Sequence, residues 1–186
     1  MLVEVERLGK RIGGREVVKN INIFLDAGEK LNIYGPHGSG KTVLLKLLVD
    51  LLVRDTGVVR IDGLDPLNHR KEVLRRTAYI PQEKPLAMKA SRNVVTIYSD
   101  VLGFGEHPAG ELRDWIVRAR ISSKPRLILI DSIDTLSKET VDLVSDYIMR
   151  EGAGLISTSV NPDNSIEYDY IGLLDDGALY IEPVMR

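Results

Sequence analysis

Cysteine is absent from this chain of 186 residues. Its absence excludes disulfide bonds, thiolate metal sites and cysteine nucleophiles, and it fits a reducing compartment such as the cytosol. A strong excess of one charge is also absent, because the net charge is −2 and the sequence pI is about 6.0. We therefore expect no nucleic-acid partner that is held through an overall basic surface. The three histidines, His37, His69 and His107, lack metal-ligand spacing.

Long apolar runs are absent as well. The most apolar helix candidate, residues 43–53, is short and is interrupted by Lys46 and Asp50, so it is too short to span a membrane. Acidic residues among the first six positions do not fit a secretory signal. We expect a cytoplasmic protein, peripheral at a membrane only through a partner. The length suits one domain with a core and a small subdomain.

Two hydrophobic patterns divide the chain. Residues 2–8 and 16–29 alternate roughly with a period of two, which predicts a small antiparallel sheet at the N-terminus. Further on, continuously apolar strands alternate with helices, which is typical of a parallel sheet with helices on both faces. The expected strands are 30–35, 77–82, 126–131 and 153–159, with a further strand between two turns in 55–63. The expected helices are 40–52, 69–76, 110–121 and 137–152, with one or two short helices around 94–101, and a hairpin is expected over 170–182.

A phosphate-binding loop is the most specific motif. Its eight residues match G-x-x-x-x-G-K-[ST] between a strand and a helix: Gly35, Pro36, His37, Gly38, Ser39, Gly40, Lys41 and Thr42. Glycines let the backbone N–H groups wrap around phosphate, and the helix N-terminus adds positive charge. We expect Lys41 to reach the β- and γ-phosphates, Thr42 to ligate Mg²⁺, and Val43 to complete the loop. His37 is interpreted as a variable loop position.

Further segments carry a family resemblance. They are "DTGVVRIDGLDPL" after the loop helix, "RRTAYIPQE" around Gln82, "RLILID" ending at Asp131, and the terminal hairpin "YIGLLDDGALYIE". In this order, from about Leu2 to Glu182, the chain resembles the ATP-binding domain of ABC transporters. The resemblance implies one nucleotide-binding domain over residues 1–186. Its fold would be a P-loop α/β fold with a mostly parallel sheet, an N-terminal antiparallel layer, and a reduced helical subdomain at about 83–120.

The same resemblance implies ATP and Mg²⁺ as cofactors. Gln82 would complete the magnesium shell and sense the γ-phosphate, and Asp131 would bind magnesium from the second shell. An aspartate that ends a fully apolar strand is costly without such a role. The predicted metal set is therefore Thr42, Gln82 and Asp131.

Several positions depart from the family pattern near the hydrolytic centre. Ser132 stands where the family has a glutamate base, and a serine cannot take a proton from water near pH 7 without a base of its own. Asp134 is a possible substitute, although its displacement by two residues counts against it. Ser159 occupies the position of the switch histidine. Ile12 replaces the aromatic residue that stacks on adenine, which predicts weaker binding and a looser choice between ATP and GTP.

The family's signature segment, LSGGQ, falls on residues 107–111 when the alignment runs back without gaps from the strand that ends at Asp131. There Pro108 lacks the hydroxyl of the family's serine, and Glu111 brings a negative charge towards phosphate. The alternative alignment, residues 102–106, ranks second because it needs a shift of five residues. Together these losses predict an ATP-binding subunit with weak or absent hydrolysis in isolation and with no assigned catalytic residue.

Two other functions stay open. The chain could be the degenerate half of an active ABC ATPase that works with a competent partner subunit. It could also be a regulatory pseudo-ATPase that uses nucleotide as a structural ligand. The expected partners are the nucleotide and either a membrane-embedded transporter subunit or a second ATP-binding subunit.

Overall fold

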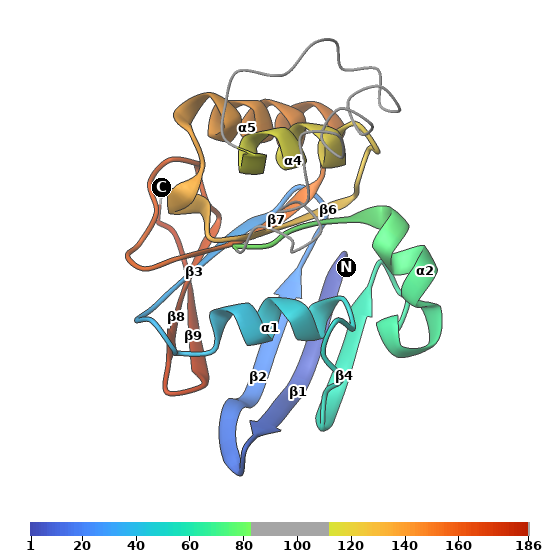
Figure 1. The fold of residues 1–186 in the computed structure, drawn as a ribbon, viewed down its shortest axis with the longest axis vertical. Helices are drawn as coiled ribbons and strands as arrows, with labels where there is room; N and C mark the ends of the chain where they lie inside the picture. The colour runs from blue at the N-terminus through green and yellow to red at the C-terminus, as the bar shows by residue number, and fades with distance from the viewer. Residues whose placement is uncertain (83–111, 186) are drawn as a thin grey trace.

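The computed structural model describes residues 1–82 and 112–185 (Figure 1). A three-stranded sheet contains β1 (Val3–Ile12), β2 (Arg15–Leu25) and β4 (Thr56–Ile61) in the order β2-β1-β4. Both pairings are antiparallel, with Val3 opposite Leu25 on one side and Ile61 on the other. The predicted N-terminal antiparallel layer is confirmed, and β4 joins it as a third strand.

A six-stranded sheet forms the second layer. It contains β3 (Lys30–Tyr34), β5 (Thr77–Ile80), β6 (Leu127–Asp131), β7 (Gly154–Ser159), β8 (Tyr170–Asp175) and β9 (Ala178–Pro183), in the order β5-β6-β7-β3-β8-β9. The first five strands in this order run parallel, and β9 closes an antiparallel hairpin with β8. The continuously apolar strands thus lie where a parallel sheet buries both of its faces.

Helices cover both faces of the six-stranded sheet (Figure 1). On one face, α1 (Lys41–Leu48) packs between the two sheets and buries Leu44, Leu45, Leu47 and Leu48. On the other face lie α4 (Leu112–Ile121) and α5 (Lys138–Glu151), with a short 3₁₀ helix, η2 (Ile133–Thr135), between β6 and α5. The predicted fold class, a P-loop α/β domain with an added antiparallel layer, is confirmed.

The ends of two helices differ from the sequence prediction. Helix α2 (Pro66–Arg76) begins three residues earlier than expected, because the Asp65 carboxylate caps it by accepting a hydrogen bond from Leu67 N at 2.9 Å and proline occupies the first turn. Helix α1 ends at Leu48, four residues earlier than expected. The one or two short helices predicted around 94–101 lie outside the described residues. Within 1–82 and 112–185, no helix has the length and apolar character needed to cross a membrane.

The turn of the β8–β9 hairpin contacts β2 and so connects the two sheets. Lys19 N donates to the carbonyl of Gly177 at 2.8 Å, and the Lys19 ammonium pairs with Asp176 at 2.7 Å. The phosphate loop, which follows β3, lies beside this connection.

Candidate functional site

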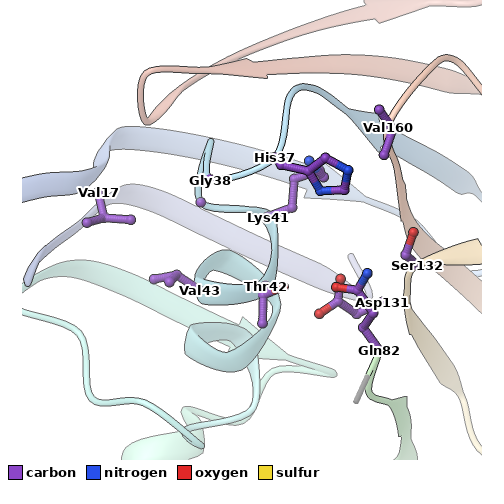
Figure 2. Close-up of a pocket in the computed structure, with 11 residues that line it drawn as sticks. Val17, His37, Gly38, Lys41, Thr42, Val43, Gln82, Asp131, Ser132 and Val160 are labelled. Carbon is purple, nitrogen blue, oxygen red and sulfur yellow. The ribbon is translucent and has the colours of Figure 1, made fainter.

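A cleft of about 190 Å³ opens where α1 begins, at the carboxyl ends of β3, β6 and β7 (Figure 2). This end of a parallel sheet is the usual ligand-binding end. Eleven residues line the cleft: Val17, His37, Gly38, Gly40, Lys41, Thr42, Val43, Gln82, Asp131, Ser132 and Val160. The structure therefore brings together most of the loop residues and all three residues of the predicted metal set.

The loop backbone is held between the two sheets. Gly40 has φ of 107°, and a Cβ atom there would lie 2.7 Å from the carbonyl oxygen of Val17 in β2. A Cβ atom on Gly35 would collide with the carbonyl of Leu174 in β8. Glycine at these two positions is required by close backbone approach, and Gly40 also by its left-handed conformation.

The Lys41 side chain folds back onto its own loop. Its ammonium donates to the carbonyl oxygens of Gly35 at 2.5 Å and Pro36 at 2.9 Å. Burial lowers the pKa of Lys41, while the charges of Asp131 and Asp134 act in the opposite direction. Two carbonyl oxygens of the loop thus hold the Lys41 ammonium against the loop backbone.

Oxygen-bearing side chains face one another across the cleft. Figure 2 shows the Asp131 carboxylate beside the Gln82 amide, on the side towards Thr42. Asp131 is only 2% exposed, and its Oδ1 accepts a hydrogen bond of 2.8 Å from Thr158 Oγ1 of β7. A carboxylate, a hydroxyl and an amide oxygen suit Mg²⁺, which retains several waters and binds phosphate oxygens. The assignment of these three residues to a metal stays a prediction.

Ser132 and Asp134 form a contact that the sequence reasoning missed. The Ser132 hydroxyl donates a hydrogen bond to Asp134 Oδ1. Asp134 Oδ2 accepts a longer hydrogen bond, 3.4 Å, from Val160 N. The carboxylate that the sequence places two residues too far along the chain thus lies directly behind a residue that lines the cleft.

Ser159 points away from the cleft, whose wall at this position is Val160. Ser159 is 1% exposed, and its hydroxyl donates to the carbonyl of Asn161 at 2.6 Å and accepts from Asn32 Nδ2 at 3.1 Å. Asn32 in turn donates to Ser157 and accepts from Asp163 N at 3.2 Å. Ser159 therefore belongs to a buried polar network under the segment after β7.

Ile12 lies beside the main cleft and does not line it. Its side chain is 45% exposed at a hollow of about 160 Å³ formed mainly by β2, the phosphate loop and the β8–β9 turn. This hollow shares Val17 and Gly38 with the main cleft. Ser39 lines the hollow as well. Both alignments of the signature segment, residues 102–106 and 107–111, lie outside the described residues, as does most of the subdomain expected at 83–120.

The fold and the cleft define a P-loop α/β domain. A model of the ABC transporter family matches residues 18–140, and the chain belongs to that family. Membership implies ATP binding, for which Mg²⁺ is typical.

Proteins of known sequence support this assignment. The ABC transporter ATP-binding protein YtrB of Bacillus subtilis (strain 168) is 25% identical over 206 residues, covering 96% of this chain and 70% of YtrB. The lipopolysaccharide export system ATP-binding protein LptB of Escherichia coli (strain K12) is 25% identical over 192 residues, covering 84% of this chain and 79% of LptB.

Solved structures share the fold. The ATP-binding subunit of an ABC transporter superposes with a TM-score of 0.78 at 18% identity, covering 99% of this chain and 90% of that one. The dimeric post-hydrolysis structure of the ATP-binding cassette MJ0796 with ADP and Pi gives a TM-score of 0.74 at 20% identity, covering 99% of both chains.

Proposed function

We propose that this chain is the ATP-binding subunit of a transporter, that it holds Mg-ATP in the cleft, and that its hydrolysis in isolation is weak or absent. One observation carries the proposal: Lys41 and Thr42 at the start of α1, Gln82 after β5, and Asp131 at the end of β6 come from three separate parts of the fold, and they line one cleft. The domain would span residues 1–186, with a reduced helical subdomain at about 83–120.

Each residue would have a distinct role in binding. The backbone N–H groups of the loop and the α1 N-terminus would surround the phosphates. Lys41 would exchange its two carbonyl partners for β- and γ-phosphate oxygens. Thr42, Gln82 and Asp131 would hold Mg²⁺, which neutralises phosphate charge when bound. Thr158 would keep the Asp131 carboxylate in place through its hydroxyl.

The weakness of hydrolysis rests on side chains around the same cleft. Ser132 lines it at the position where a base is expected, and Ser159 is turned into the interior. Ile12 would offer the adenine ring an aliphatic surface and no aromatic ring to stack on. Groups that act together on one phosphoryl transfer do not replace one another singly.

A thermal-shift experiment tests nucleotide binding. A ligand at 100 times its dissociation constant stabilises the folded state by about 2.7 kcal/mol, and for a chain of this length that raises the melting temperature by roughly 5–11 °C. We expect Mg-ATP to produce such a shift in the parent and none in Lys41→Ala. Lys46→Ala is the matched control, since Lys46 lies five residues further along α1 and does not line the cleft. An undiminished shift in Lys41→Ala would remove the phosphate loop from the proposal.

The partner would be a membrane-embedded transporter subunit or a second ATP-binding subunit. In either case the chain would act at the cytoplasmic face of a membrane without entering it. Isolation from cells, followed by identification of copurifying polypeptides and bound nucleotide, tests this point. A nucleotide-loaded soluble monomer would instead favour the regulatory pseudo-ATPase.

A further inference from the structure

A hydroxyl and a carboxylate are paired in the wall of the cleft, directly after the predicted magnesium residue. Ser132 is 5% exposed, lines the cleft, and donates its hydroxyl proton to Asp134 Oδ1. A hydroxyl that donates its proton has two lone pairs with which it can accept. Ser132 can therefore face a water molecule on one side and a carboxylate on the other.

The turn after β6 keeps this pair in place. Helix η2 follows Ser132 directly, and Thr135 Oγ1 donates to the carbonyl of Ser132 at 2.8 Å. Val160 N donates to the second oxygen of Asp134, which connects the turn to the end of β7. The carboxylate is thus held by two contacts, one from Ser132 just after β6 and one from Val160 just after β7.

The Ser132 hydroxyl does not cap the helix that follows it. Ser132 occupies the N-cap position of η2, where a side-chain oxygen usually accepts from a backbone N–H. No such capping bond is present in η2, and the proton of Ser132 is directed to a carboxylate. This is the arrangement by which a base activates a hydroxyl.

We propose that Ser132 and Asp134 form a two-residue proton relay that supports slow ATP hydrolysis at this site. The proposal rests on the proposed Mg-ATP site. It removes the objection that a serine needs a base of its own, since Asp134 is that base. Ser132 would contact the attacking water, and Asp134 would act through Ser132 as the positioning and proton-accepting group.

The reaction step balances. One O–H bond of the water breaks, and its proton passes to Ser132 Oγ while the hydroxyl proton of Ser132 passes to Asp134 Oδ1. The water oxygen forms a bond to the γ-phosphorus. The bond from the γ-phosphorus to the bridging oxygen breaks, and ADP leaves with that electron pair. Asp134 then releases its proton to solvent or to the phosphate product, which restores the pair.

Single-turnover release of phosphate from γ-labelled Mg-ATP tests the relay, with Lys41→Ala as the blank. We expect Asp134→Asn and Ser132→Ala each to reduce the rate at saturating Mg-ATP by about ten-fold or more. General-base catalysis contributes about 10²–10⁴-fold, and we set the threshold below this range because solvent water can replace part of the lost base. The Mg-ATP concentration for half-maximal rate should not change. The double variant should lose little more, because the two residues act as one unit. Asp134→Glu, which retains a carboxylate, should recover part of the rate.

Asp142→Asn is the matched control, since Asp142 is an exposed carboxylate of α5 that does not line the cleft. If Asp134→Asn proves unstable, Ser132→Ala removes the relay from the other end without touching the bond from Val160. A parent-like rate in either variant overturns the relay. A parent that shows the Mg-ATP thermal shift but no Lys41-dependent hydrolysis overturns the relay and leaves the binding site standing. A parent without the shift overturns the proposed function itself.

Discussion

The hydroxyl of Thr158 should support both folding and Mg-ATP binding. Thr158 is fully buried in β7, and its Oγ1 donates a 2.8 Å hydrogen bond to the buried Asp131 carboxylate. Thr158→Val keeps the shape of the side chain and replaces only the hydroxyl, with a methyl group. A hydrogen bond to a charged group contributes about 1.5–3 kcal/mol. For a chain of this length that lowers the melting temperature by roughly 3–12 °C.

The same substitution should weaken metal-dependent binding more than binding of nucleotide alone. Asp131 would lose the group that orients it, and loss of such a supporting partner lowers metal affinity by about 10–100-fold. Titration of ATP with and without Mg²⁺ measures the two affinities separately. We expect the affinity without Mg²⁺ to change little.

Thr77→Val is the matched control. Thr77 begins β5 in the same sheet and is 2% exposed, and its hydroxyl has no hydrogen-bond partner among residues 1–82 and 112–185. Replacing that hydroxyl with a methyl group should leave the melting temperature unchanged or raise it slightly. If Thr158→Val costs no more stability than Thr77→Val and leaves Mg-ATP affinity intact, the assigned role of Asp131 is refuted.

Two further predictions concern hydrolysis and assembly. Ser132→Glu should leave phosphate release near the Lys41→Ala background, because the new carboxylate would face Asp134 and the other departures from the family remain; a rise of about ten-fold or more would mean that the site is one residue from full activity. In sedimentation with Mg-ATP, the isolated chain should form no nucleotide-dependent dimer, because Pro108 and Glu111 are poorly suited to hold a second subunit's phosphate. An ATP-induced dimer that dissociates with ADP would contradict this.

Elements with a strong local pattern could be predicted from the sequence. The apolar strands, the phosphate loop and the terminal hairpin turning at Asp176 and Gly177 all lie where expected. The pairing of β4 with β1 could not be predicted, because the partners lie about fifty residues apart and nothing in either strand specifies the other. The sequence therefore predicts that β4 is a strand but does not predict the sheet to which it belongs.

The directions in which single side chains near the cleft point could not be predicted from the sequence either. All six residues of β7 are buried, so no alternation of polar and apolar residues shows which way Ser159 points. The position of Asp134, two residues beyond Ser132, counts against it as a substitute base in the sequence, but the short η2 turn brings its carboxylate back to Ser132. A turn of three residues decides this geometry, and sequence patterns specify such turns poorly.

The position of the phosphate loop between the sheets has a mechanical consequence. Gly40 lies against Val17 of β2, Gly35 lies against Leu174 of β8, and Lys19 joins β2 to the turn after β8. A nucleotide that stiffens the loop must therefore also restrict sliding of one sheet against the other. Amide protons of β2 and β8, although remote from one another in sequence, should exchange with deuterated solvent more slowly together when Mg-ATP is present. Occupancy of one cleft would in this way be transmitted through the domain as a change in rigidity.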